Sequence, residues 1–215
     1  VQKVAKQYQA SITEYLNAVL LYSLLQKQEH DFHLRLRPVR IAMPVNLRRF
    51  FPSKTLRNFI TMVYPSIDPR LGDYTFEEIV TQVHHYMRYY INSKFLRGDI
   101  TTNASTQRNP LIRIVPLFLK DFVVRQFYQR VQDKNSSAGL TNMGAIRVPD
   151  DMKPYLERFD IYMGIPYSQR TNCAIVSFED TLTVNFASCI IEADVERRFF
   201  QKLVEDGIPV TIESN

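Results

Sequence analysis

The sequence is poor in cysteine and glycine and lacks any long apolar run. Its two cysteines, Cys173 and Cys189, cannot build a disulfide framework, which favours a reducing cytoplasm, although a single bond between them stays open. Six glycines supply no glycine-rich phosphate loop. The apolar stretch AVLLYSLL at 18–25 is far shorter than the roughly 18 residues of a membrane span and is typical of a buried helix face.

The remaining composition is that of a globular protein. The chain has 215 residues, of which 45% are hydrophobic and 23% charged, enough for one large domain with a sizeable core. Twenty-seven Lys and Arg against 22 Asp and Glu give a formal charge of +5, spread along the chain without a dense basic block. This charge predicts mild attraction to anions such as a phosphorylated cofactor and argues against nucleic acid as a partner.

The first half of the chain predicts two helices separated by an irregular strand region. Ser11 and Glu14 form a capping box that opens a helix to about Lys27. Apolar and polar residues alternate over 32–48, which predicts a strand, but Pro38 and Pro44 restrict it to a sheet edge or an interrupted strand. A loop follows at 65–73, and apolar residues at helical spacing predict a second helix over 75–91.

The second half predicts strands flanked by helices. We expect a polar loop at 101–110, then a long apolar helix from Asn109-Pro110 to about Gln132 with a kink at Pro116. Further on, the patterns predict a strand over 136–149, a hairpin over 172–191, a helix over 195–207 closed by Gly207, and a final strand in IPVTIES. In the hairpin we expect two opposed apolar sets, namely Ala174, Val176, Phe178 and Leu182, Val184, Phe186. This mixture predicts an α/β fold: a layered sandwich with a mixed, mainly antiparallel sheet and helices packed on it.

The histidines are poor candidates for catalysis or metal binding. Adjacent residues on a helix cannot line one site, and His84 falls at the edge of the predicted core face while His85 falls almost opposite it. No Glu, Asp or Cys lies four residues from either, and His30 and His33 have no partner in a known metal pattern. We therefore predict no metal site. A cysteine nucleophile is also disfavoured, because both thiols lie in apolar strand sequence.

Two polar groups of residues stand out within apolar sequence. The first is PVNLRRFFPSKTLRNF at 44–59, with Asn46, Arg48 and Asn58. The second is GLTNMGAIRVP at 139–149, with Thr141, Asn142 and Gly144. A buried amide costs free energy unless its donors and acceptors are satisfied. These residues either line a binding site or satisfy turns and sheet edges, and the pattern alone leaves both interpretations open.

These segments resemble a known superfamily. PVNLRRFFPSKTLRNF is similar to the V-N/D-x-R … G-N stretch of CoA-dependent acyltransferases, and GLTNMGAIRVP to their S/T-N-x-G strand. ASITEYLNAVLLYSLL resembles the helix that opens the second half of these enzymes, and FFQKLVEDGIPVTIES their C-terminal end. The superfamily includes chloramphenicol acetyltransferase, plant alcohol acyltransferases and the condensation domains of peptide synthetases. The likeness covers nearly the whole chain and is greatest to bacterial alcohol acetyltransferase-like proteins.

The resemblance implies a chloramphenicol acetyltransferase-like lobe and an incomplete enzyme. The family has two similar halves with a tunnel between them, and its His-His-x-x-x-Asp-Gly motif in the first half supplies the general base. That motif is absent here, since Tyr89 and Tyr90 follow His84-His85 where Asp and Gly would stand. The helical start VQKVAKQYQ also lacks a capping residue, which suggests a missing upstream piece. We therefore expect 1–215 to be a C-terminal lobe, with 1–10 a remnant of the inter-lobe helix or linker and the N-terminal lobe absent.

The implied function is that of half an O-acyltransferase. It would move an acyl group from acyl-CoA or an acyl-carrier thioester to an alcohol or amine, with no permanently bound cofactor and its own N-terminal lobe as partner. By the resemblance, Asn46, Arg48 and Asn58 would shape and brace the tunnel wall. Thr141, Asn142 and Gly144 would line the tunnel near the thioester, with Gly144 admitting the donor close to the backbone. The alternative is a non-catalytic module that binds an acyl group or a protein. In either case the chain alone is expected to be inactive.

Overall fold

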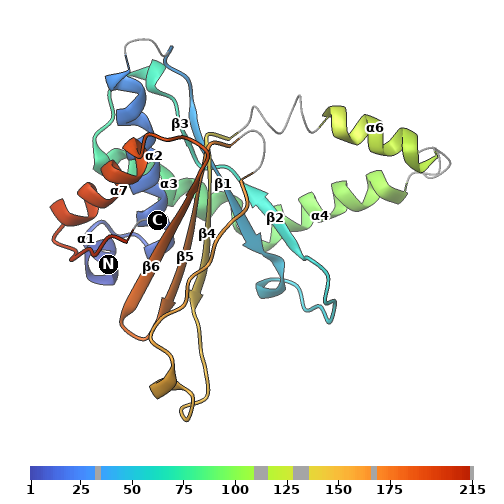
Figure 1. Cartoon of the computed structure of the whole chain (residues 1–215). Coiled ribbons are helices and arrows are strands. Elements are labelled where there is room, and N and C mark those ends of the chain that lie inside the picture. The colour runs from blue at the N-terminus through green and yellow to red at the C-terminus, as the bar shows by residue number, and fades with distance from the viewer. Residues whose placement is uncertain (32–34, 109–115, 128–135, 166–168, 214–215) are drawn as a thin grey trace.

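One mixed sheet forms the centre of the molecule. The computed structural model describes residues 1–31, 35–108, 116–127, 136–165 and 169–213. Within these ranges five strands follow the order β2-β1-β4-β5-β6, and a short sixth strand, β3, also pairs with β1 (Figure 1). The strands are β1 (Val39–Asn46), β2 (Ile60–Val63), β3 (Ser66–Ile67), β4 (Ala138–Ala145), β5 (Thr171–Phe178) and β6 (Thr181–Ser188).

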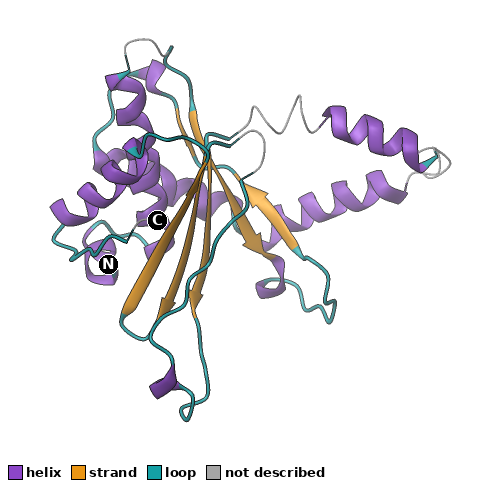
Figure 2. Ribbon diagram, in the orientation of Figure 1, coloured by secondary structure: helices purple, strands orange, loops and turns teal. Residues whose placement is uncertain are grey.

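Four helices form a layer beside this sheet. They are α1 (Gln2–Gln7), α2 (Ile12–His30), α3 (Phe76–Tyr90) and α7 (Asp194–Glu205), and Figure 2 shows them gathered on one side of the strands. The capping box at the start of α2 is confirmed, because Ser11 accepts from the Glu14 amide and the Glu14 carboxylate accepts from the Ser11 amide. The middle of α2 is fully buried between the sheet and α3, which agrees with the prediction of a buried helix face at 18–25. The layered α/β architecture is thus confirmed, and no described helix is long and apolar enough to cross a membrane.

The region 32–48, predicted as an edge or interrupted strand, contains the internal strand β1, which begins after Pro38 and includes Pro44, so the edge alternative was wrong. β1 pairs antiparallel with β2 and β3 on one side and parallel with β4 on the other. The amides of Ile41 and Leu47 donate to the β2–β3 side, so the even-numbered Pro44 turns its nitrogen to the β4 side. Pairing with β4 involves only Ile41 and Ala42. Proline is tolerated because the parallel ladder ends before Pro44.

The β5–β6 hairpin is confirmed, but its two apolar sets do not oppose each other. The register places Ile175 opposite Val184 and Cys173 opposite Phe186, and these residues face the helix layer. The two-residue turn pairs Phe178 with Thr181, so the strands are one residue out of the register that would bring the two apolar sets opposite each other. Because neighbouring strand residues point to opposite faces, this shift places the two sets on different faces of the sheet. Ala174, Val176 and Phe178 therefore face away from the helices. There the returning segment 156–165 covers them, with the Phe159 ring 5.2 Å from that of Phe178.

The predicted loop at 101–110 is wrong over its described part, because Ser93–Arg108 is a helix, α4. Asn92 opens it by accepting from the amides of Lys94 and Phe95, and the Thr101 hydroxyl donates to the Arg97 carbonyl. Polar side chains can form hydrogen bonds with the backbone of their own helix, so a polar stretch of this kind need not be a loop. The predicted Asn109-Pro110 cap lies outside the described residues, as do the two ends of the apolar helix.

The described part of that apolar helix is α6 (Leu117–Phe127). Pro116 stands immediately before it and accepts from the amides of Leu119 and Lys120, so it begins α6 instead of kinking it. Together α4 and α6 project away from the sheet and the helix layer (Figure 1). Their exposed apolar side chains include Phe118 and Phe122.

The C-terminal region agrees with its predicted helix and differs in its predicted strand. Helix α7 ends before Gly207, whose φ of +78° is the left-handed conformation that glycine adopts readily. The described part of IPVTIES, 208–213, is not a strand. The alternating apolar residues of this segment instead anchor a C-terminal tail on the core, since Ile208 is buried and Val210 packs on the core residues.

Candidate functional site

The two predicted polar groups lie at the same edge of the sheet. Strands β1, β4 and β5 run parallel, so their carboxyl ends share one edge, where ligands of open α/β sheets commonly bind. Beyond the pair Ala42–Gly139, β1 and β2 turn away from β4 (Figure 1). Asn46 ends β1 on one side of this divergence, and Asn142 and Gly144 end β4 on the other.

Asn142 is held within the chain at both ends of its amide. Its Oδ1 accepts from the Gly144 amide at 2.8 Å, and its Nδ2 donates to Thr13 Oγ1 on α2 at 3.0 Å. The pairing of β4 with β5 shifts between Asn142 and Ala145, which is a β-bulge. The side chain thus braces the bulge and ties the end of β4 to the start of α2. The Asn142 oxygen can still accept one more hydrogen bond, and its nitrogen can still donate one more.

Gly144 is required by the backbone of this bulge. Its φ of +76° is costly for residues with a Cβ, while a Cβ built there would meet nothing within 4 Å. The predicted donor approach to its backbone therefore has free space on that side. Thr141 does not join Asn142, because successive strand residues point to opposite faces. It lies opposite Ala174, on the face away from the helices.

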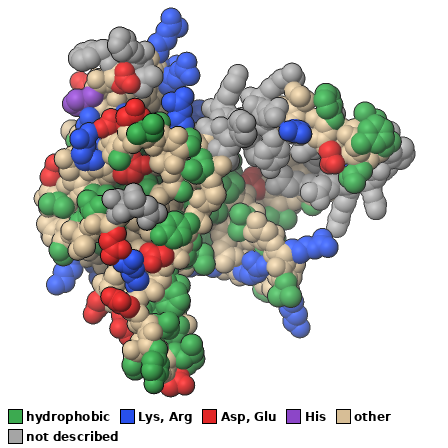
Figure 3. Space-filling view, viewed as in Figure 1, with side chains coloured by type: hydrophobic (Ala, Val, Ile, Leu, Met, Phe, Trp, Pro, Cys, Tyr) green, Lys and Arg blue, Asp and Glu red, His purple; other side chains and the backbone are tan. Residues whose placement is uncertain are grey.

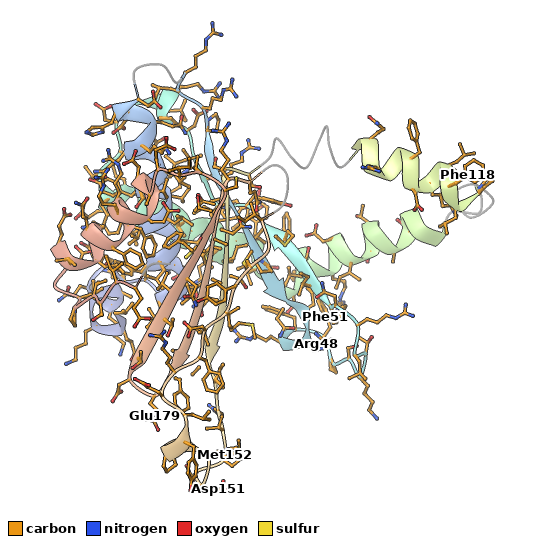
Figure 4. The ribbon with its side chains drawn as sticks, viewed as in Figure 1. Arg48, Phe51, Phe118, Asp151, Met152 and Glu179 are labelled. Atoms are coloured by element: carbon orange, nitrogen blue, oxygen red, sulfur yellow. The ribbon has the colours of Figure 1, made fainter. Side chains whose placement is uncertain are left out.

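The β1 group organises the loop 47–58. Asn46 caps the short helix Leu47–Arg49 by accepting from the Arg48 amide at 3.0 Å. Arg48 Nη2 donates to the carbonyls of Thr55 and Arg57, at 2.9 and 2.6 Å. These contacts hold the loop in one conformation, and Asn58 is exposed in the same loop. Figure 4 shows Arg48 and Phe51 together in this loop, apart from the tip that carries Met152 and Glu179.

Sequence reasoning missed Thr13 and Asn17, which lie one turn apart on α2. Asn17 is completely buried, and its Nδ2 donates to the Thr13 carbonyl and contacts Met43 Sδ on β1, both at 3.2 Å. Its Oδ1 has no hydrogen-bond partner among the described residues. The available signal was an amide inside an apolar helix face, at i+4 from a threonine. Helix α2 therefore contacts both diverging strands through polar side chains.

The start of β4 is fixed by a second asparagine. Asn172 Oδ1 accepts from the Gly139 amide at 2.8 Å, and its Nδ2 donates to the Gly164 carbonyl at 2.9 Å. A Cβ at Gly139 would stand 2.6 Å from Asn172 Oδ1, so a larger residue there would have to displace the Asn172 side chain. This contact aligns β4 on β5 before the bulge.

The histidines are placed as their helix spacing predicted. His84 is half-buried, and its Nδ1 lies 3.2 Å from Glu14 Oε2, whereas His85 is exposed. This contact joins α3 to α2 within the helix layer. No group of three potential metal ligands occurs in the part of the chain that the structure describes. Both cysteines are free, so the open disulfide is absent, and burial raises the pKa of the Cys173 thiol, which makes it a poor nucleophile.

If the chain is half of an acyltransferase, as the resemblance implies, we expect that replacing His84 and His85 together with Gln leaves the activity of a protein with both halves within a few-fold. The reason is that one side chain pairs with Glu14 inside the helix layer and the other faces solvent. Steady-state kinetics check this expectation, with the single His85→Gln variant as control. A loss approaching a thousandfold, the scale of general-base removal, would assign catalysis to this pair.

Solved structures with the same fold come from acyl-transfer and condensation systems. No protein-family model and no curated protein sequence matches the chain. The trichothecene 15-O-acetyltransferase of Fusarium sporotrichioides superposes on 95% of the chain with a TM-score of 0.58 and 14% identity. The epimerization domain from the third module of tyrocidine synthetase B superposes on 94% of the chain, with a TM-score of 0.55 and 12% identity. The condensation domain for chain release from the enacyloxin polyketide synthase superposes on the whole chain, with a TM-score of 0.50 and 16% identity.

These likenesses concern the fold and only part of each known protein. The chain spans 43%, 43% and 41% of the lengths of those three structures, in the order given. The predicted fold likeness to condensation domains and CoA-dependent acyltransferases is therefore confirmed.

Proposed function

We propose that this chain is the C-terminal lobe of an alcohol acetyltransferase-like O-acyltransferase. In this proposal it works with an N-terminal lobe that carries the His-His-x-x-x-Asp-Gly motif. The observation that carries the proposal is the braced bulge of Asn142 and Gly144 at the carboxyl edge of the sheet. The fold shared with an acetyltransferase and a condensation domain supports it.

In the proposed reaction the other lobe's histidine takes the proton of the acceptor hydroxyl as its oxygen attacks the thioester carbonyl. The resulting tetrahedral oxyanion collapses and expels the thiolate of the acyl-CoA or carrier-bound donor. This lobe contributes the opposite wall, where Gly144 leaves the backbone open and Asn142 keeps it in place. The single remaining bonding positions of the Asn142 amide would serve the donor.

The proposed partner lobe would also cover apolar surface. Figure 3 shows hydrophobic side chains on the projecting helices and at the tip of the sheet. The exposed side chains are those of Leu117, Phe118, Phe122, Met152 and Tyr155. Exposed apolar surface of this kind marks interaction sites. We also propose the cytoplasm as the compartment, which the two free thiols support.

A non-catalytic acyl- or protein-binding module is the second candidate. The specific observation in its favour is that both ends of the Asn142 amide already bond within the chain. In addition, the ring of His84 contacts Glu14 and that of His30 contacts the Gln26 carbonyl, and both of these partners lie on α2.

Asn142→Ala tests the site in a protein with both lobes. If the amide serves the donor, kcat/KM should fall by about 1–3 kcal/mol, roughly 5- to 150-fold, the scale for losing a bond to a buried polar partner. Thr13→Val is the matched control, because it removes the helix-side bond and leaves Asn142 in place. Kinetics and melting temperature are measured on both variants. Equal losses of stability with unchanged kcat/KM would show that Asn142 acts only as a brace.

A further inference from the structure

Residues 1–10, which we call the strap, are held on the rest of the chain by few contacts. Helix α1 within the strap has six residues, which is too short for a helix to be stable without packing. Ala5 and Ala10 are buried, whereas Val1, Val4 and Tyr8 pack against the core only in part. The docking of the strap therefore depends on the geometry of its end and on the contacts of Tyr8.

The strap ends in a motif in which the left-handed residue is usually glycine. The Gln9 amide donates to the Lys6 carbonyl at 3.0 Å and the Ala10 amide to the Ala5 carbonyl at 2.9 Å, which is the Schellman pattern of hydrogen bonds. Gln9 takes the left-handed position of this pattern, with a φ of +54°. That conformation costs free energy for a residue that has a Cβ.

Helix α7 ends in the same pattern and provides a comparison within the molecule. The Gly207 amide donates to the Val204 carbonyl and the Ile208 amide to the Leu203 carbonyl, both at 2.9 Å. Here the left-handed residue is Gly207, with a φ of +78°, which glycine adopts readily. The end of α7 is therefore unstrained and the end of the strap is strained, and strain at a joint between two elements makes the docked state easier to leave.

The ends of the strap and of α7 meet at one carboxylate. The Tyr8 hydroxyl donates to Asp206 Oδ1 at 3.4 Å, and the Tyr15 hydroxyl of α2 donates to Asp206 Oδ2 at 2.6 Å. The Tyr8 ring stacks on the Tyr15 ring, with centroids 5.9 Å apart, and lies edge-on to the Phe76 ring of α3 at 5.2 Å. Tyr8 thus joins the strap to α2, α3 and α7 at one point.

The first turn of α2 connects this point to the candidate site. Thr13 lies in that turn, two residues before Tyr15. Its hydroxyl accepts from Asn142 Nδ2 at 3.0 Å, and Asn142 Oδ1 accepts from the Gly144 amide at 2.8 Å. Each step from the strap to the β4 bulge is therefore a direct contact or lies within one helical turn.

We infer that the strap is a conformational device with a docked and a released state, and that docking of Tyr8 fixes the first turn of α2 and the Asn142 brace behind it. Release of the strap removes the ring that covers Tyr15 and loosens the bulge. The functional meaning rests on the proposed function, in which the strap is the joint to the upstream lobe. A movement of that lobe would then reach the wall at Asn142 through these contacts. Tyr8 is a positioning residue, since it acts through Thr13 and Asn142.

Amide hydrogen exchange of the 215-residue chain, followed by NMR at single amides, tests the coupling without any enzyme activity. The Ala10 amide reports on the strap and the Gly144 amide on the bulge, because each donates to a group of its own element. Gln9→Gly removes the strain and should slow exchange at both amides, by about fivefold at Ala10. Tyr8→Ala should speed exchange at both by about tenfold.

Two controls separate this coupling from a general change in stability. The Ile91 amide, which donates to the Met87 carbonyl at the far end of α3, should change less than about twofold in either variant. Tyr90→Ala truncates another half-buried tyrosine, whose ring contacts Tyr86 and Phe95, and should leave Ala10 and Gly144 unchanged. Exchange at Gly144 that ignores the strap in Tyr8→Ala, or that rises equally in Tyr90→Ala, overturns the inference. If Tyr8→Ala is poorly folded, Gln9→Gly decides, because it acts in the stabilising direction: unchanged exchange at either amide overturns the inference.

Kinetics of a protein with both lobes distinguish this inference from the proposed function. Tyr8→Ala should lower kcat/KM, and its effect should largely disappear when Asn142 is already Ala, because both substitutions act on the same brace. Independent, multiplicative losses overturn the inference and leave the proposed function standing. An inactive two-lobed protein in which exchange at Gly144 still follows the strap supports the coupling and counts against the proposed function alone.

Discussion

The 215-residue chain by itself should release no CoA from acetyl-CoA in the presence of an alcohol, at any rate above the uncatalysed background. A positioned general base contributes roughly 10²- to 10⁴-fold to proton transfer, and the His-His-x-x-x-Asp-Gly motif is absent. Two of the described histidines already contact groups of the helix layer: the His84 ring lies against the Glu14 carboxylate, and the His30 ring against the Gln26 carbonyl. Thiol release, followed with a chromogenic disulfide reagent, measures the rate.

The positive control is a protein in which the chain is joined to a lobe that carries the motif. That protein should turn over, and replacing the second histidine of its motif with Ala should return the rate to that of the isolated chain. Clear turnover by the isolated chain would show that the base lies within it. An inactive two-lobed protein that still binds an acyl group would favour the non-catalytic module.

Replacing Asp206 with Ala should destabilise the fold by about 3–5 kcal/mol, the usual cost of removing one partner of a buried ion pair. Asp206 Oδ1 lies 2.6 Å from Lys202 Nζ, and Oδ2 accepts from the Tyr15 hydroxyl at 2.6 Å. The side chains of Lys202 and Asp206 are only 13% and 9% exposed. Burial has the largest single effect and would lower the pKa of Lys202, but the hydrogen bond to Asp206 and the nearby negative charges together outweigh it, so the pKa is raised. Without Asp206 the Lys202 ammonium loses its ion-pair partner and retains the Phe76 ring, 4.3 Å away, as a weaker contact. Urea unfolding at neutral pH measures the change.

Asp194→Ala is the matched control on the same helix. Asp194 pairs with Arg197, whose side chain is largely exposed, so its loss should cost no more than about 1 kcal/mol. If the two variants unfold at the same urea concentration, the Asp206 contacts do not stabilise the fold. The result matters for function because Tyr15 and Thr13 belong to the same helix: the Asp206 contacts hold the start of α2, and α2 holds Asn142.

The local features of the fold were predictable where the signal was short-range. Ser11 and Glu14 specify a cap through residues three apart, and Gly207 specifies a helix end through its own backbone freedom. The β5–β6 hairpin followed from apolar runs around a two-residue turn, but its register did not. One residue decides which set faces the helices, and composition around the turn does not reveal that shift.

The candidate site was predictable as a set of residues and not as an arrangement. Asn46, Arg48 and Asn142 were recognisable as amides and a cation in apolar surroundings, and the resemblance gave them an order. Their partners are distant in sequence: Thr13 lies 129 positions from Asn142. Thr13 itself appeared to be an ordinary residue of a capping box. Such a pairing arises only when α2 is laid across the sheet.

By itself the sequence determined the element types that rest on period and caps, the fold likeness and the absence of the catalytic motif. The tertiary structure decided that the strand with Pro44 is internal, that 93–108 is helical, and that Asn142 bonds to Thr13 on α2. The physical reason is the range of each interaction. Helical periodicity and capping act over three or four residues, whereas strand order, sheet register and charge pairing depend on contacts between residues far apart in the chain.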